Sequence, residues 1–119
     1  MRLKILIVDD SEATRGMLRD FFEINGHNVV ADADAPDSAL KAFAEHKPDL
    51  VTLDLSLKDG NGLGVLKSMR RMDPNAKILV ISGNSQKAVR ESVLASGAGF
   101  LGKPIDFDAL LAAVTAAAP

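Results

Sequence analysis

The feature that most constrains the fold of this chain is an alternation of two kinds of segment. Short apolar runs rich in β-branched residues alternate with longer runs in which apolar residues recur with the period of a helix. The short runs are almost continuously apolar, which is typical of strands covered on both faces of a parallel sheet. They occupy residues 4–8, 29–33, 50–53, 77–81 and 99–101.

The first long run predicts a helix that ends at Asn25-Gly26, a common signal for a helix C-terminus. Either Asp10 or Ser11 could cap its start. We expect a buried stripe of apolar residues at helical spacing, with Leu18 and Phe22 beside it. The stripe consists of Ala13, Met17, Phe21 and Ile24.

The later long runs also predict helices. Asp34 and Asp37 stand at capping-box spacing before the second helix. The third ends before Pro74, the fourth runs from about residue 85 to residue 96 and stops at Gly97, and the last begins at Asp106. The apolar residues at helical spacing are Leu40 and Phe43 in the second, Val65, Leu66, Met69 and Met72 in the third, and Phe107, Leu110, Leu111 and Val114 in the last.

Strands that alternate with helices through short connections predict an α/β fold. We expect a doubly wound, five-stranded parallel sheet with right-handed crossovers and helices on both faces. The chain has 119 residues and no linker or low-complexity stretch, so residues 1–119 are expected to form one domain.

Composition narrows the functional class. Cysteine is absent, which excludes a disulfide framework, a thiolate metal site and a cysteine nucleophile, and suits the cytoplasm. A formal net charge of −2 argues against a nucleic-acid or anionic membrane surface. The apolar run at residues 5–8 ends in Asp9-Asp10 and is too short to span a membrane. His27 and His46 are isolated and are expected at the surface.

Polar residues follow four of the five predicted strands. Asp9-Asp10 come after the first strand and Asp54 after the third, while Ser82 follows the fourth and Lys103 comes just past the fifth. In a doubly wound sheet the carboxyl ends of the strands lie at one edge, where ligands bind. We therefore expect these side chains to meet there.

Crowded carboxylates repel one another unless a cation is present. Oxygen ligands without cysteine or histidine suit a hard cation, and Mg²⁺ is the usual choice. A carboxylate can also act as a nucleophile in phosphoryl transfer, assisted by a metal and by donors to the phosphoryl oxygens. Asp54, the acidic pair, Ser82 and Lys103 can each supply one of these parts.

Five stretches, taken in this order and at this spacing, resemble the receiver domains of two-component response regulators. The resemblance covers nearly the whole chain and is to the CheY-like members. It implies a flavodoxin-like fold with strand order 2-1-3-4-5. The stretches are residues 5–10 (ILIVDD), 48–55 (PDLVTLDL), 59–62 (DGNG), 78–83 (ILVISG) and 98–104 (AGFLGKP).

The resemblance also implies roles for single residues. Asp54 is expected to be the phospho-acceptor. Asp9 and Asp10 are expected to hold Mg²⁺ together with Asp54 and the backbone carbonyl of Ser56.

Three later positions complete the expected set. Ser82 is expected to be the switch hydroxyl and Phe100 an aromatic rotamer switch. Lys103 is expected to contact the phosphate, and the Lys103–Pro104 peptide bond is expected to be cis.

Some positions depart from the family pattern. Lys58 stands where many members have proline in the loop after the acceptor, so this loop is expected to differ in mobility or charge. Ser82 replaces the commoner threonine, and Gly83-Asn84-Ser85 replace the usual small-residue turn. Ser56 and Asn84 flank the phosphate and are not acidic.

The implied function is a phosphorylation switch that is not an enzyme. A sensor histidine kinase or phosphotransfer protein would donate the phosphoryl group. A downstream effector protein or output domain would read a face made by the fourth helix, the fifth strand and the fifth helix. The domain is expected to contact neither nucleic acid nor membrane, and to be a monomer or a weak phosphorylation-dependent dimer.

Three alternatives remain open. The chain could be the receiver part of a longer regulator with a DNA-binding or enzymatic output domain. It could be a Mg²⁺-dependent phosphohydrolase with an aspartate nucleophile, although 119 residues leave little chain for a substrate cavity. A flavin-binding flavodoxin fits less well, because tryptophan and tyrosine are absent and the strand ends are acidic.

Overall fold

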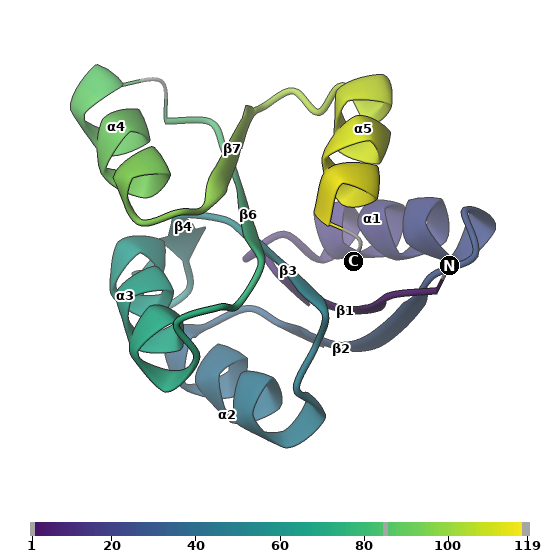
Figure 1. Cartoon of the computed structure of the whole chain (residues 1–119), viewed down its shortest axis with the longest axis horizontal. Coiled ribbons are helices and arrows are strands. Elements are labelled where there is room, and N and C mark those ends of the chain that lie inside the picture. The colour runs from purple at the N-terminus through teal and green to yellow at the C-terminus, as the bar shows by residue number, and fades with distance from the viewer. Residues whose placement is uncertain (1, 85, 118–119) are drawn as a thin grey trace.

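The computed structural model describes residues 2–84 and 86–117 (Figure 1). Five parallel strands form the main sheet in the order β2-β1-β3-β6-β7, which confirms the predicted flavodoxin-like order 2-1-3-4-5. The strands are β1 (Lys4–Val8), β2 (Asn28–Ala33), β3 (Leu50–Leu53), β6 (Ile78–Ser82) and β7 (Gly99–Gly102). Two further short strands, β4 (Ser56–Leu57) and β5 (Gly60–Asn61), pair antiparallel in the loop after β3.

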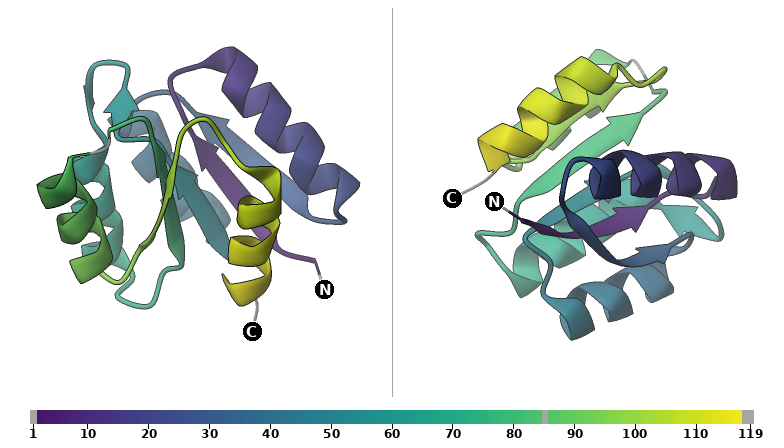
Figure 2. Two further views of the ribbon diagram at one scale, coloured as in Figure 1. Left: turned by 90° about the horizontal axis from the view of Figure 1, so that it is seen from above. Right: turned by 90° about the vertical axis from the view of Figure 1, so that its right-hand side faces the viewer.

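Five helices cover the sheet, as predicted. Helices α1 (Glu12–Ile24) and α5 (Phe107–Ala117) lie on one face, and α2 (Pro36–His46), α3 (Gly62–Met72) and α4 (Lys87–Ala95) lie on the other (Figures 1 and 2). Within the described residues, no helix combines the length and apolar character needed to cross a membrane.

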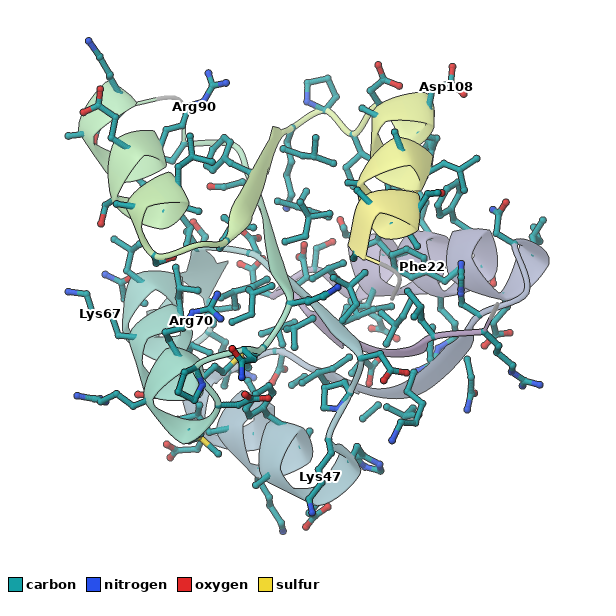
Figure 3. All side chains as sticks on the ribbon, in the orientation of Figure 1. Phe22, Lys47, Lys67, Arg70, Arg90 and Asp108 are labelled. Atoms are coloured by element: carbon teal, nitrogen blue, oxygen red, sulfur yellow. The ribbon has the colours of Figure 1, made fainter. Side chains whose placement is uncertain are left out.

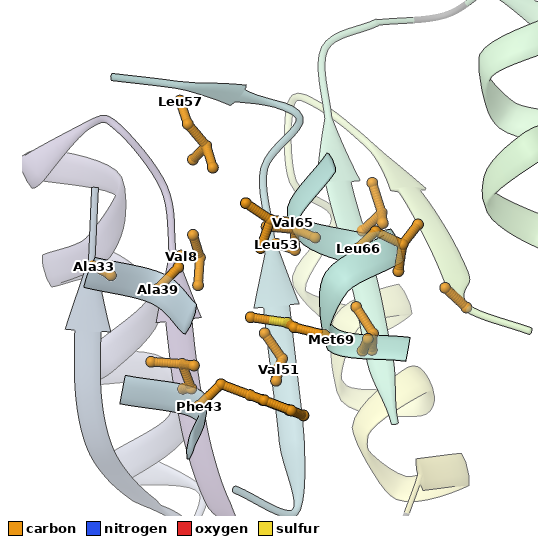
Figure 4. Packing of buried hydrophobic residues seen from close by; sticks show 14 of the residues in the cluster. Val8, Ala33, Ala39, Phe43, Val51, Leu53, Leu57, Val65, Leu66 and Met69 are labelled. Atoms are coloured by element: carbon orange, nitrogen blue, oxygen red, sulfur yellow. The ribbon is translucent and has the colours of Figure 1, made fainter. Parts of the chain in front are cut away.

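Each face of the sheet has its own apolar layer, because side chains alternate along every strand. Leu6 and Val8 point into the layer under α2, α3 and α4, whereas Ile5 and Ile7 point into the layer under α1 and α5. Figure 4 shows Met69 of α3 over the first of these layers. Burial on both faces explains why the strand sequences are continuously apolar rather than alternating.

The predicted buried stripe of α1 is wrong. Met17 is 42% exposed and Ile24 is 83% exposed, whereas Leu18 and Phe22 are fully buried. Phe21 is half-buried and packs against Phe107 of α5, with ring centroids 5.1 Å apart. The helix therefore turns the row that contains Leu18 and Phe22 toward the sheet, and not the predicted row. Ala13, also assigned to the stripe, is exposed.

The ends of α1 agree better with prediction. Ser11, and not Asp10, is the N-cap, and its hydroxyl accepts a hydrogen bond from the Thr14 N–H at 3.2 Å. The helix ends at Asn25 followed by Gly26, whose φ of +85° is the left-handed conformation that glycine adopts without strain.

Other helix details differ from expectation. Asp34 does not cap α2: the N-cap is Ala35 without a side-chain hydrogen bond, and Pro36 occupies the first turn. Three apolar residues assigned to helix stripes are largely exposed, because each helix buries only the side chains that face the sheet. They are Met72 at 49%, Phe107 at 37% and Leu111 at 40%.

The fourth predicted helix is shorter than expected. It begins at Lys87 and ends at Ala95, with Ser96 as its C-cap and Gly97 at φ +86°. Ser85, the predicted start, lies outside the described residues, as do Met1, Ala118 and Pro119.

His27 is buried, in contrast to the predicted surface position, whereas His46 is exposed as expected. The Nδ1 atom of His27 accepts a hydrogen bond from the Leu3 N–H at 3.1 Å. Burial lowers the pKa of His27, because the charged ring is less well solvated there, and the positive N-terminus acts in the same direction. The ring nitrogen therefore satisfies the Leu3 N–H in place of a backbone carbonyl.

Candidate functional site

The predicted site residues lie at the carboxyl edge of four neighbouring strands. Backbone hydrogen bonds continue each ladder past the strand end: Asp9 N–H donates to Ala33 O at 3.0 Å, and Asp54 N–H donates to Val8 O at 2.8 Å. At the far side of the site, Lys103 N–H donates to Ser82 O at 3.0 Å. The side chains are therefore held on rigid backbone, as a preorganised site requires.

Lys103 bridges the two buried carboxylates. Its Nζ lies 3.1 Å from Asp9 Oδ2 and 3.0 Å from Asp54 Oδ2. Asp9 is 2% exposed and Asp54 is 4% exposed. The Lys103–Pro104 peptide bond is cis, as predicted.

The second oxygen of each carboxylate is also hydrogen-bonded. Asp9 Oδ1 accepts from the Ser11 N–H at 2.9 Å, and Asp54 Oδ1 accepts from the Ser56 N–H at 3.1 Å. These charge-assisted bonds fix the orientation of both carboxylates and offset part of the cost of burying them.

Burial raises the pKa of Asp9, because the ionised form loses solvation. The Ser11 N–H and Lys103 favour the ionised form but do not outweigh burial, and nearby Asp54 raises this pKa further. Partial burial by itself lowers the pKa of Lys103, but the hydrogen bonds to Asp54 and Asp9 outweigh it and leave the pKa raised. The ammonium group is therefore firmly charged, whereas the Asp9 carboxylate is destabilised.

Asp10 completes an acidic group with the two bridged carboxylates. One oxygen from each of Asp9, Asp10 and Asp54 lies within 4.8 Å of the others, and Asp10 is exposed. Three carboxylates against one ammonium group leave two negative charges uncompensated in this cluster. An all-oxygen donor set with this excess charge fits a hard divalent cation such as Mg²⁺. The fit agrees with the predicted ligands, while the contribution of the Ser56 carbonyl stays a prediction.

Ser82 and Phe100 lie at the border of the site. Ser82 is the last residue of β6 and is buried, and its Oγ accepts a hydrogen bond from the Asn84 N–H at 3.0 Å. Phe100 is half-buried on β7 and lies opposite Val80 of β6. Ser82 lies opposite Gly102, two residues further along both strands. A cavity of about 330 Å³ lies between them, lined by Ser82, Gly83, Asn84, Arg90, Phe100, Leu101, Gly102 and Lys103.

The loop after Asp54 contains regular secondary structure. It forms the β4–β5 hairpin, with Asp59 at φ +58° in the turn. Lys58, which departs from the family pattern, is exposed, and its N–H donates to Asp34 O at 3.0 Å. Gly62 follows the hairpin, and a Cβ there would collide with the carbonyl oxygen of Asp54. Close packing at Gly62 thus sets the position of the acceptor backbone.

Sequence reasoning missed Arg15. Its Nη1 donates to the backbone carbonyl of Asp9 at 2.8 Å, and its Nε lies 3.5 Å from Asp32 Oδ2. This contact holds the turn that presents the acidic pair. The available signal was a basic residue near the start of α1, where the helix dipole disfavours positive charge and a specific partner is therefore expected.

Comparison with known proteins agrees with this geometry. The model of the response regulator receiver domain family matches residues 5–115. The chain is 36% identical over 115 residues to the chemotaxis protein CheY of Bacillus subtilis, covering 96% of each chain. It is 38% identical over 105 residues to CheY of Thermotoga maritima, covering 87% of this chain and 88% of that protein.

A solved structure shows the same fold. In the CheX-CheY-BeF3-Mg²⁺ complex from Borrelia burgdorferi, the matching chain superposes with a TM-score of 0.91 at 30% identity, over 95% of this chain and 87% of that one. The strand order, the acidic cluster and the matched sequence all lead to the same assignment. This chain belongs to the response regulator receiver domain family.

Proposed function

We propose that this chain is a phosphorylation-switched receiver that accepts a phosphoryl group on Asp54. The observation that carries the proposal is the bridge from Lys103 Nζ to Asp9 and Asp54 within a cluster of three carboxylates. Of the three, Asp54 is buried and central, and it follows the middle strand of the sheet.

In this proposal a partner histidine kinase or phosphotransfer protein presents a phosphohistidine. A carboxylate oxygen of Asp54 attacks the phosphorus, the P–N bond breaks, and the imidazole leaves with the electron pair of that bond. Lys103 then offsets negative charge on the transferred phosphoryl group and on the Asp9 carboxylate. The product is an acyl phosphate on Asp54.

Asp9, Asp10, Asp54 and the backbone carbonyl of Ser56 would hold Mg²⁺ beside the acceptor. When bound, Mg²⁺ neutralises charge on the carboxylates and on the phosphoryl oxygens. The burial of Asp9 and the rigid backbone around Asp54 keep the donor oxygens in place before the phosphoryl group arrives.

Ser82 and Phe100 would carry the signal outward. The hydroxyl of Ser82 accepts from Asn84 and keeps its own hydrogen for another acceptor, so it can donate to a phosphoryl oxygen. Movement of Ser82 would let Phe100 turn toward the cavity beside it. The face made by α4, β7 and α5 would then differ between the two states and be read by a downstream protein or an output domain.

Asp54 is consumed stoichiometrically in this proposal, so the chain acts as a switch and not as an enzyme with external substrates. The phosphohydrolase alternative requires multiple turnover. Receiver domains are in general signalling switches, and this chain belongs to their family.

The test is incubation with Mg²⁺ and a small phosphodonor, followed by intact-mass measurement. We expect the mass of one added phosphoryl group on the wild type and none on Asp54→Ala. Asp49→Asn is the matched control, because Asp49 precedes the same strand at its opposite end and should leave uptake unchanged. Uptake by Asp54→Ala equal to that of the wild type would contradict the proposal, and sustained hydrolysis of small phosphate esters would favour the phosphohydrolase.

A further inference from the structure

Helix α4 is attached to the rest of the molecule by few side chains. Val93 is its buried residue, while Leu94 is 50% exposed. Among the described elements, α4 packs mainly against β7. Helices that bury so little apolar surface belong to the less stable parts of a fold, so a single further contact has a measurable effect on them.

Such a contact is present between Arg90 of α4 and Phe100 of β7. The guanidinium carbon of Arg90 lies 5.8 Å from the centroid of the Phe100 ring, within the range of a cation–π interaction. Figure 3 shows Arg90 on the side of α4 that is turned toward β7. The ring itself is half-buried and packs against the apolar layer under α2, α3 and α4.

Arg90 and Phe100 also share the cavity that reaches the candidate site. The cavity of about 330 Å³ is lined by both of them and by Ser82 and Lys103. Its wall at Gly83 is open, since a Cβ placed there would meet nothing within 4 Å. The Phe100 ring therefore has free space on the side of Ser82 and a cationic partner on the side of α4.

We propose that Arg90 is a positioning residue for Phe100: its guanidinium holds the ring at the mouth of this cavity and thereby ties α4 to the candidate site. The inference rests on the proposed function, in which Ser82 moves and the ring turns inward. An inward turn takes the ring away from Arg90, so the contact stabilises the resting arrangement. Loss of the contact shifts the population toward the switched one.

The experiment is a double-mutant cycle with Arg90→Ala, Phe100→Leu and the two combined. Phe100→Leu keeps an apolar side chain but removes the aromatic face. Lys87→Ala is the control, because Lys87 is an exposed cation on the same helix, 3.7 Å from Glu91 and outside the cavity lining. Two quantities are measured: amide hydrogen exchange in α4 without phosphodonor, and the initial rate of phosphoryl uptake with Mg²⁺.

We expect Arg90→Ala to speed exchange in α4 and phosphoryl uptake each by about two- to fivefold, the size of an exposed cation–π contact. In the Phe100→Leu background the same substitution should have little effect on either rate. Equal effects of Arg90→Ala with and without Phe100→Leu would overturn the inference. An effect of Lys87→Ala as large as that of Arg90→Ala would overturn it as well, since charge alone would then be responsible.

The two proposals fail in different ways. If the wild type takes up no phosphoryl group, the proposed function is wrong, but hydrogen exchange still reports whether Arg90 acts through Phe100. If uptake occurs on Asp54 and the cycle shows no coupling, the positioning role of Arg90 is wrong while the receiver function stands.

Discussion

The ammonium group of Lys103 lies 3.0 Å from the carboxylate of Asp54, a residue 49 positions earlier in the chain. The β4–β5 hairpin, two crossover helices and the strands β6 and β7 separate these residues in sequence, and the parallel sheet brings their strand ends to one edge. The same ammonium group contacts Asp9, so three strands contribute to one charged cluster.

Asp9→Asn should stabilise the protein in metal-free buffer at neutral pH. The folded-state pKa of Asp9 is raised by burial above its ordinary value of 3.8. Because the folded chain holds the Asp9 proton more tightly than the unfolded chain does, protonated Asp9 contributes stability to the fold. This contribution is complete below pH 3.8 and is lost as pH rises through the folded-state pKa. The neutral amide avoids this loss, and we expect a gain of about 1 kcal/mol in a urea unfolding curve.

Asp10→Asn is the control for this measurement. Asp10 is exposed, so its substitution should change the free energy of unfolding by less than about 0.5 kcal/mol. A lower urea midpoint for Asp9→Asn than for the wild type would show that the ion pair with Lys103 outweighs the cost of burial.

Mg²⁺ should raise the melting temperature, because it binds the folded cluster and not the unfolded chain. At ten times its dissociation constant the ligand stabilises by about 1.4 kcal/mol, which corresponds to about 5 °C for a domain of this size. A thermal melt with Mg²⁺ and after chelation measures the difference. Asp9→Asn and Asp10→Asn should each reduce the shift strongly, whereas Asp49→Asn should retain it. A shift that persists in all three variants would place the cation elsewhere.

Gly62→Ala should destabilise the fold by about 3 kcal/mol, because the added Cβ collides with the Asp54 carbonyl oxygen and the Leu55 backbone. Displacement of Asp54 should also reduce phosphoryl uptake. Gly64→Ala is a matched control in the same helix, where a Cβ meets nothing within 4 Å. There, alanine should stabilise by about 0.5–1 kcal/mol through its higher helix propensity. Urea midpoints that fall equally in both variants would contradict the assigned packing.

Stability should fall as pH drops below about 6.5, because the unfolded chain then binds a proton at His27 more readily than the folded chain does. Its folded-state pKa lies below the ordinary value of 6.5 because of burial. The unfolded chain therefore binds the proton first as pH falls. The stabilisation is complete above pH 6.5 and is lost as pH falls toward the folded-state pKa. Protonation also removes the Nδ1 acceptor that serves Leu3 N–H.

His27→Asn keeps a side-chain acceptor near the position of Nδ1 but does not titrate. The slope of unfolding free energy against pH should flatten in this variant as pH falls below about 6.5. Parallel slopes for the wild type and His27→Asn would exclude His27 as the titrating group.

The sequence by itself determined the sheet and the location of the chemistry. Continuous apolar runs can be satisfied only by burial on both faces, so the strands and the parallel fold follow from local pattern. Once those strands are parallel, their carboxyl ends share one edge, and Asp9, Asp54, Ser82 and Lys103 come together there without further information.

The tertiary structure alone decided which face of each helix is buried and how the site is supported. The sequence pattern favoured the row of α1 that contains Met17 and Ile24, but contact with the sheet buried Leu18 and Phe22 instead. The bonds from Arg15 to Asp9 and from Leu3 to His27 likewise join residues whose pairing no local pattern shows. Burial and partner choice depend on distances between segments remote in sequence, whereas strand formation depends on periodicity that neighbours in the chain already display.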